Sequence, residues 1–290
     1  MFEMKGMKCD ETRRGCTFIG VLGITVLALL IIVGIAGAEP FVYIANSYSN
    51  SVSVIDTATN KVTATIDVGK YPRSIAASPD GTNIYVANLW ENTISVINTT
   101  INTVTATISV GNEPNGVAVT PDGTKVYVTN FNDDTVSVID TATNTVTSTV
   151  PVGYIPCGVV VSPDGLKVYV MSGRDIPAYI SVIDTVSNTV VKIKIFNPDG
   201  FDRVTVTPDG AKLYVTPFSF DNQVYVIDTS TNAVTAWVKV GSWPNGVTVT
   251  PDGTEVYVVN SDSNNVSIID TATNTVTSTV TVGYEPLEVA

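Results

Sequence analysis

Aromatic and asparagine side chains, set in short segments between apolar runs, are the residues of this sequence best suited to chemistry. Aromatic rings offer apolar contact to sugars or peptides, and amide groups add directional hydrogen bonds. The rings that we expect to bind a ligand stand in such segments; they are Trp90, Phe131, Tyr154, Phe218, Trp243 and Tyr284. The alternative is that rings of this kind cap sheets and that the asparagines hold turns in the left-handed conformation.

Catalytic chemistry finds little support in the composition. The sequence contains no histidine, which removes the commonest general base and the commonest metal ligand together. It also lacks the Gly-x-Ser-x-Gly pattern that presents a nucleophilic serine. We therefore expect no catalytic residue, no enzyme activity and no cofactor.

Aspartates fall into two sets with different expected roles. One set recurs at the same turn in five of the six units, which indicates a structural role; it is Asp56, Asp140, Asp184, Asp228 and Asp270. The other set stands in irregular segments, where carboxylates could gather a calcium ion; it is Asp133, Asp134, Asp175, Asp202, Asp221 and Asp262. Its spacing matches no compact calcium loop, so no metal ligand is predicted and calcium stays an alternative.

A repeat with a period near 42 residues positions all of these side chains. Its markers are six tyrosines, spaced 42, 42, 42, 45 and 43 residues apart, namely Tyr43, Tyr85, Tyr127, Tyr169, Tyr214 and Tyr257. A fixed period of this size without helical patterning predicts stacked or circularly arranged β units. We expect these tyrosines in the core, with their hydroxyl groups bonded to the backbone.

One unit, residues 114–153, shows the expected strands. An apolar run at 116–120 leads into Pro-Asp-Gly, whose residue types favour a tight turn. Runs at 126–129 and 136–140 and a fourth at 145–150 follow, rich in Val, Thr and Ile. Four short antiparallel strands per unit predict one blade of a β-propeller.

Two recurring motifs support a resemblance to a known family. Pro-Asp-Gly follows the expected first strand in five units, and an Ile-Asp/Asn-Thr ending of the third strand occurs six times. Residues 41–290 resemble the YVTN-type β-propeller repeats of archaeal surface-layer and other cell-surface proteins, and Tyr127-Val128-Thr129-Asn130 matches the family signature. The resemblance implies an all-β propeller of four-stranded antiparallel blades on a non-catalytic surface protein.

The number of blades departs from the family, whose members typically have seven. This chain supplies six units, so we predict a six-bladed propeller, with part of a seven-bladed propeller as the alternative. Aligning Pro286 with Pro114 places the last residues in a first strand, whereas the first unit begins at a second strand, Phe41-Val42-Tyr43. The last residues are therefore expected to complete the first blade and close the ring.

Successive turns of an antiparallel meander alternate between the two ends of a sheet. The Pro-Asp-Gly turns and the turns that follow the third strands share one end. The loops after the tyrosine strands and the Val-Gly-x-x-Pro segments share the other. Four inserted residues all fall in the second set, within 172–179, 196–203 and 217–222. Variation between units is typical of binding loops, so ligand binding is expected at that end.

The first 38 residues differ from the rest and predict export. A basic leader is followed by an uncharged apolar stretch at 15–38 that ends in Ala36-Gly37-Ala38, a small-x-small cleavage pattern. We expect a signal peptide at 1–38, or alternatively an uncleaved membrane anchor helix, before a propeller domain at 39–290. Without the leader the chain carries 24 acidic and 11 basic residues, which disfavours nucleic acid and anionic lipid as partners. Two glycosylation sequons begin at Asn98 and Asn265.

Taken together, the residues favour an exported cell-surface or surface-layer protein that is not an enzyme. Its expected role is adhesion, envelope structure or ligand binding, with cell-envelope polymers, glycans or other surface proteins as partners. The alternative is a metal-dependent propeller hydrolase of the lactonase kind, or another propeller enzyme. That alternative would require several acidic side chains converging at the channel mouth on a divalent ion.

Overall fold

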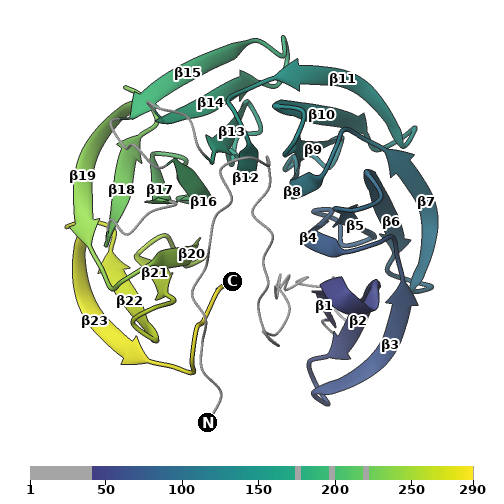
Figure 1. Cartoon of the computed structure of the whole chain (residues 1–290), viewed down its shortest axis with the longest axis horizontal. Coiled ribbons are helices and arrows are strands. Elements are labelled where there is room, and N and C mark those ends of the chain that lie inside the picture. The colour runs from purple at the N-terminus through teal and green to yellow at the C-terminus, as the bar shows by residue number, and fades with distance from the viewer. Residues whose placement is uncertain (1–40, 174–177, 196–199, 218–221, 290) are drawn as a thin grey trace, which may run out of the picture.

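Short strands rich in β-branched residues make up nearly all of the regular secondary structure in the described part of the chain. A computed structural model describes residues 41–173, 178–195, 200–217 and 222–289. They form six antiparallel sheets in chain order, which we number as blades 1 to 6. Blade 1 contains β1–β3, and blades 2 to 6 contain β4–β7, β8–β11, β12–β15, β16–β19 and β20–β23. Figure 1 shows the six blades arranged side by side around a centre.

The strands occupy four positions, from the centre outward. First strands are β4 (Pro72–Ala77), β8 (Pro114–Val119), β12 (Pro156–Val161), β16 (Phe201–Val206) and β20 (Pro244–Val249). Second strands are β1 (Phe41–Asn46), β5 (Asn83–Asn88), β9 (Lys125–Asn130), β13 (Lys167–Ser172), β17 (Lys212–Pro217) and β21 (Glu255–Asn260). Third strands are β2 (Ser51–Asp56), β6 (Thr93–Asn98), β10 (Thr135–Asp140), β14 (Ala178–Asp184), β18 (Gln223–Asp228) and β22 (Asn265–Asp270). Fourth strands are β3 (Lys61–Asp67), β7 (Thr103–Ser109), β11 (Thr145–Pro151), β15 (Val190–Ile195), β19 (Ala233–Lys239) and β23 (Thr275–Thr281).

The observed strands confirm the expected all-β fold and the four strands of the model unit. In blade 3 the register pairs Ser137 with Val128 across β10 and β9, and with Thr149 across β10 and β11. A short 3-10 helix, η1 (Ser47–Ser49), lies between β1 and β2. The leader at 1–38, with its predicted anchor helix, lies outside the described residues. Within the part of the chain that is described, no helix has the length and apolarity needed to cross a bilayer.

Apolar side chains are buried between neighbouring blades. Tyr43 and Val54 of blade 1 pack with Ile84 and Ile97 of blade 2 in one cluster, and the same arrangement links blade 5 to blade 6. Each blade therefore has a front face, which carries the core tyrosine and packs on the next blade. Its back face packs on the preceding blade. Burial of these faces supplies the hydrophobic stabilisation of the fold.

Five of the six core tyrosines are buried as expected, whereas Tyr257 is half-buried. The predicted backbone partners of the hydroxyl groups were wrong in three blades. In blade 6 the Tyr257 hydroxyl donates to Glu255 Oε2 at 3.1 Å. The Tyr43 hydroxyl donates to Asn102 Oδ1 at 3.0 Å, and the Tyr214 hydroxyl donates to Asn274 Oδ1 at 2.7 Å. Both acceptors are side-chain amides at the turn before a fourth strand, in the next blade along the chain. Turn asparagines, rather than the backbone, therefore satisfy the hydroxyl groups of Tyr43 and Tyr214.

Ring closure by the last residues, as the sequence predicted, does not occur in this structure. Among the described residues the sheet of blade 1 has three strands, and residues 284–289 do not pair with β1. They run along blade 6 instead, where Gly246 N donates to Leu287 O at 2.9 Å and Ser261 Oγ donates to Pro286 O at 2.6 Å. In Figure 1 the arc of blades is open between blade 6 and blade 1.

Candidate ligand-binding face

The two ends of the blades differ in how strictly they repeat. One end, the turn rim, carries the Pro-Asp-Gly turns and the turns after the third strands. The two kinds of turn contact each other: Thr141 Oγ1 donates to Gly123 O at 2.8 Å, and Thr271 Oγ1 donates to Gly253 O at 2.6 Å. The other end, the loop rim, carries the loops after the second strands and the segments that lead into the first strands.

Aspartates of the turn rim hold turns. Asp140 Oδ1 accepts hydrogen bonds from Thr143 N and Thr143 Oγ1, both at 2.9 Å. Asp252 Oδ1 accepts from Thr250 Oγ1 at 2.5 Å and from Thr254 N at 3.0 Å. The hydroxyl of Thr250 and then the backbone of Thr254 lower the pKa of Asp252 to about 2. The contacts of Asp140 agree with the structural role expected from the recurrence of its turn.

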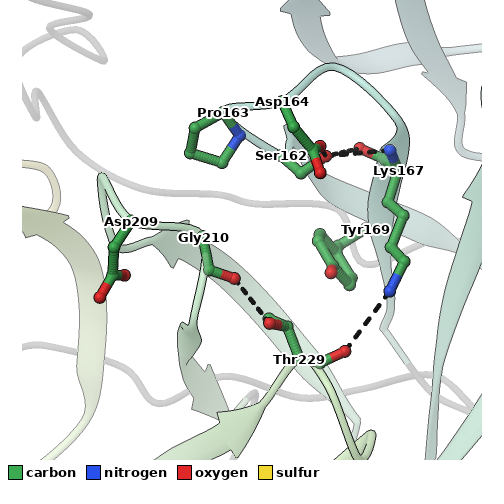
Figure 2. A pocket seen from close by; sticks show the side chains of 8 residues that line it. All are labelled: Ser162, Pro163, Asp164, Lys167, Tyr169, Asp209, Gly210 and Thr229. Carbon is green, nitrogen blue, oxygen red and sulfur yellow. Dashed lines mark hydrogen bonds between the residues drawn. The ribbon is translucent and has the colours of Figure 1, made fainter.

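A small pocket opens on the turn rim between blades 4 and 5 (Figure 2). Its volume is about 110 Å³, and Ser162, Asp164, Lys167, Asp209 and Thr229 contribute to its wall. Pockets for small molecules are larger, at roughly 300–1,000 Å³. Lys167 Nζ donates across it to Thr229 O at 3.4 Å.

Two other blades make the same lysine contact as this pocket. Lys125 Nζ donates to Thr185 O at 2.6 Å, and Lys212 Nζ donates to Thr271 O at 2.5 Å. Because this contact recurs between successive blades along the arc, its role is to hold neighbouring blades together. The pocket therefore belongs to the scaffold.

Metal binding has no ligand set in the part of the chain that the structure describes. There, no three Asp, Glu, Cys or His side chains lie close enough together to hold an ion. Of the residues considered for calcium, Asp133 accepts hydrogen bonds from Asn112 N and Asn112 Nδ2, each at 2.7 Å. Asp175 and Asp221 lie outside the described residues.

On the loop rim, three rings of blades 1 and 2 form a continuous row. The rings of Tyr71 and Trp90 are stacked, with centroids 4.2 Å apart and planes inclined by 24°. The rings of Tyr48 and Tyr71 are T-shaped to each other, with centroids 5.5 Å apart and planes at 83°. Tyr48 is 70% exposed and Trp90 is 62% exposed, so both outer rings of the row are open to solvent. We call Tyr48, Tyr71 and Trp90 the aromatic cluster.

Backbone contacts fix the middle of the cluster. Tyr71 has a φ of 55°, in the left-handed region, and its N–H donates to Asn50 Oδ1 at 2.9 Å. Its carbonyl accepts a hydrogen bond from Leu89 N at 3.1 Å, and Trp90 N donates to Lys70 O at 3.2 Å. The loop of blade 2 is thus tied to the segment that enters it, which holds Trp90 over Tyr71. Burial, and after it the hydroxyl of Tyr48, raises the pKa of Tyr71.

The backbone hydrogen bond that holds the middle of this cluster recurs in other blades along the arc, but the row of aromatic rings does not. The hydrogen bond from Tyr71 N to a side chain 21 residues earlier recurs in three further units. The donors there are Glu113 N, Ile155 N and Glu285 N. These residues and Trp243 share the positive φ of Tyr71. The loop position of Tyr48 and Trp90 is occupied by Asn132 in blade 3 and Asp262 in blade 6. A row of three rings is therefore not a requirement of the scaffold, unlike the repeated turns.

Polar side chains border the cluster. Asn50, Lys70 and Glu91 are exposed next to the three rings in the same loops. The backbone N–H of Glu113 bonds to the loop of Trp90 in the same way as the backbone N–H of Tyr71 bonds to the loop of Tyr48. Rings flanked by an amide, an ammonium and carboxylates can combine stacking with hydrogen bonds to hydroxyl groups.

The structure does not gather the six predicted ring residues in one place. Trp90 belongs to the aromatic cluster, whereas Phe131, Tyr154, Trp243 and Tyr284 stand in loops of other blades along the arc. Tyr154 and Tyr284 are 39% and 71% exposed, and Phe131 and Trp243 are half-buried. Phe218 lies outside the described residues.

Sequence reasoning placed Tyr48 and Tyr71 at this end but did not select them. Comparison of equivalent loop positions in adjacent units would have found Tyr48, since an aromatic residue occurs at this position only in units 1 and 2 among the four loops compared above. Tyr71 stands in a different segment, which this comparison does not reach. Of the sequon residues, Asn98 Oδ1 accepts from Thr100 N at 3.0 Å, and Asn265 Oδ1 accepts from Asn260 Nδ2 at 2.8 Å.

Comparison with known proteins agrees with this architecture. A family model described as a YNCE-like beta-propeller matches residues 82–194. Hydrazine synthase of Kuenenia stuttgartiensis, a solved structure, superposes with a TM-score of 0.78 over 86% of this chain and 85% of its own. The chain is a β-propeller. Its identity to hydrazine synthase is 24%, so that likeness shows the propeller fold alone, and no curated protein matches the sequence.

Proposed function

We propose that this propeller is an exported, non-catalytic binding protein of the cell surface whose aromatic cluster takes carbohydrate. The ligands would be glycans or polymers of the cell envelope, and the role would be adhesion or envelope structure. The leader sequence at 1–38 supports export, and the resemblance to YVTN-type repeats supports a place at the surface.

One observation carries the proposal: solvent-exposed rings form a row where the repeat itself does not require rings. The scaffold positions Tyr71 and the loop of Trp90 by bonds that recur in other blades, so the rings are free to serve another purpose. Exposed apolar rings are costly in water unless a ligand covers them. Pyranose rings present an apolar face of C–H groups bordered by hydroxyl groups, which matches rings bordered by Asn50, Lys70 and Glu91.

A binding experiment with matched variants tests the proposal. The protein is applied to an array of envelope glycans as wild type, Trp90→Ala and Trp237→Ala. Trp237 is 61% exposed on β19, so it controls for the loss of an equally exposed indole elsewhere. We expect Trp90→Ala to weaken binding at least tenfold, which corresponds to about 1.4 kcal/mol, and Trp237→Ala to bind as wild type does.

A second matched pair uses the tyrosine at the end of the row. Tyr48→Ala removes a ring that is 70% exposed, and Tyr284→Ala removes one that is 71% exposed on another part of the loop rim. Weaker binding by Tyr48→Ala alone supports the cluster as the site. Equal binding by wild type and both Trp90→Ala and Tyr48→Ala contradicts it. Mass spectrometry of the exported protein tests cleavage after Ala38 and glycan occupancy at Asn98 and Asn265.

A further inference from the structure

The two Asn-x-Ser/Thr sequons of this chain lie in different surroundings. Asn98 ends β6, the third strand of blade 2, and Thr100 lies in the following turn on the turn rim. Asn265 begins β22, the third strand of blade 6, at the loop rim, and Ser267 lies inside that strand. The asparagine of such a triplet accepts an N-linked glycan when it lies on the surface of an exported protein. The contacts of each triplet therefore decide which of the two is open to modification.

The triplet at Asn265 is part of a contact that the scaffold repeats. Asn260 Nδ2 donates to Asn265 Oδ1 at 2.8 Å and to Ser267 Oγ at 2.9 Å. In blades 1, 2 and 3 the asparagine that ends the second strand makes the same pair of hydrogen bonds; the acceptors are Ser51 and Ser53, Thr93 and Ser95, and Thr135 and Ser137. Ser267 is 2% exposed, so its hydroxyl group is closed to a transferase. The packing of the blade thus explains this triplet.

The triplet at Asn98 departs from the repeat. Aspartate occupies its position in the other five units; these residues are Asp56, Asp140, Asp184, Asp228 and Asp270. At the position of Thr100 the other units have no threonine; they have Ala58, Ala142, Val186, Ser230 and Ala272. Unit 2 therefore differs at both of the positions that a sequon requires. Because the other five turns are built with aspartate, the turn itself requires neither change.

The side chain of Asn98 holds its turn through the oxygen atom alone. Thr100 N donates to Asn98 Oδ1 at 3.0 Å, and Ile101 N donates to it at 3.2 Å. Backbone N–H groups can only donate, so these bonds fix the oxygen toward the turn and place Nδ2 at the other end of the amide. The Nδ2 atom makes no hydrogen bond to any described residue and is not buried. Thr100 is exposed as well, so the amide nitrogen and the threonine are both open to solvent.

We infer that Asn98 is the attachment site of an N-linked glycan and that Asn265 carries none in the folded protein. The inference rests on the export in the proposed function, since such glycans are attached to exported chains. The donor is an oligosaccharide linked through phosphate to a lipid. Asn98 Nδ2 forms a bond to C1 of the first sugar, and the bond from C1 to the phosphate oxygen breaks. The lipid phosphate leaves with the bonding electrons, and one Nδ2 proton passes to a base of the transferase.

A glycan at Asn98 lies away from the aromatic cluster. The strand β6 runs from the loop that carries Trp90 to the turn that follows Asn98, and a strand of this length spans about 20 Å. The glycan thus projects from the turn rim and leaves the loop rim open. Ile101, which is 61% exposed, stands next to the attachment point where the other units have Thr or Ser. The first sugar can cover this apolar side chain, which lowers its cost in water.

Transfer in vitro to the folded protein tests the inference. The full chain is produced in a bacterium that lacks N-glycosylation, and is then incubated with a purified oligosaccharyltransferase and a lipid-linked oligosaccharide. The enzyme is one that modifies synthetic peptides of residues 92–104 and 259–271, so both triplets are substrates outside the fold. Peptide mass spectrometry locates and quantifies the glycan, and the thermal unfolding midpoint checks that each variant is folded.

Two variants introduce a residue that the repeat uses elsewhere at the same position, which preserves the fold. Asn98→Asp introduces the aspartate of the other five units, and Asn265→Thr introduces the threonine of blades 2 and 3. A third variant combines Asp140→Asn with Ala142→Thr, which builds the triplet of Asn98 into the equivalent turn of blade 3.

We expect wild type and Asn265→Thr to carry one glycan at Asn98, and Asn98→Asp to carry at least tenfold less. The third variant should carry a second glycan. Modification of Asn265 in the folded protein, or occupancy of Asn98 below a tenth of that of its peptide, would overturn the inference. So would a third variant that gains no second glycan. Because the acceptor is purified and folded beforehand, failure here is distinct from failure of export or of carbohydrate binding by the aromatic cluster.

Discussion

A glycine series provides a graded test of how first strands pack between blades. Gly116 in β8 lies against β12, where an added Cβ would clash with the Cys157 carbonyl oxygen and lie 3.0 Å from Val159 Cγ1. Gly246 in β20 is the equivalent residue of blade 6, and its added Cβ would lie 2.7 Å from Glu288 Cα. An added Cβ at Gly283 would meet no atom within 4 Å.

The expected costs follow from what each methyl group would meet. Replacing glycine by alanine favours folding by about 0.4–1 kcal/mol through the unfolded chain, and overpacking a core costs about 1–3 kcal/mol. Gly116→Ala should therefore lose about 1–2 kcal/mol, because two close-packed blades must separate. That loss corresponds to a fall of about 2–8 °C in Tm for a domain of this size. Gly283→Ala should keep or slightly raise Tm.

Gly246→Ala tests a contact on one face of a single blade, whereas Gly116→Ala tests the interface between two blades. Its methyl group displaces residues 284–289, which one face of blade 6 holds, so Tm should change much less than in Gly116→Ala. Hydrogen exchange at the backbone amide of residue 246 should accelerate, since its bond to Leu287 O is disturbed. Equal Tm for Gly116→Ala and Gly283→Ala would refute this account of the packing.

Three further predictions concern titration and hydrogen bonding. Hydrogen bonds lower the pKa of turn-rim carboxylates, to about 2 for Asp228 and Asp252, so this stabilisation is present at neutral pH. It is lost as pH falls below 4 toward 2, which a fall of Tm in acid would show and a constant Tm would contradict. Burial raises the pKa of Tyr127 and Tyr214 to about 12. An absorbance titration should therefore show that both hydroxyl groups remain protonated at pH 11 as long as the protein is folded. Tyr214→Phe should cost about 1 kcal/mol in urea unfolding, because its hydroxyl donates to Asn274 Oδ1, and an unchanged midpoint would contradict that role.

The sequence predicted the parts of the fold that repeat. Asp140 was expected to hold a turn and Tyr127 to be buried, because a scaffold must build each of these features once per blade. The sequence predicted less well the features that depend on how all six blades are arranged. Closure by the last residues was wrong, since the direction of residues 284–289 is set by packing on blade 6.

The candidate site could be predicted only in part, for a related reason. Trp90 was recognised as a ring at a variable position, but its partners depend on how two loops 19 residues apart fold against each other. Tyr71 meets Trp90 because Leu89 N donates to Tyr71 O and Trp90 N donates to Lys70 O, contacts that no local pattern in the sequence reveals. The expected binding end of the blades nevertheless includes the cluster.

The most direct test of the aromatic cluster as the binding site uses the three tryptophans as reporters. In the protein labelled with ¹⁵N-tryptophan, Trp90, Trp237 and Trp243 give separate indole N–H signals, which are assigned by replacing each residue in turn. Titration with a bound envelope oligosaccharide should shift the Trp90 signal progressively and leave the Trp237 signal in place. A shift confined to Trp243 or Trp237, with Trp90 unmoved at saturation, would contradict the assignment of the site.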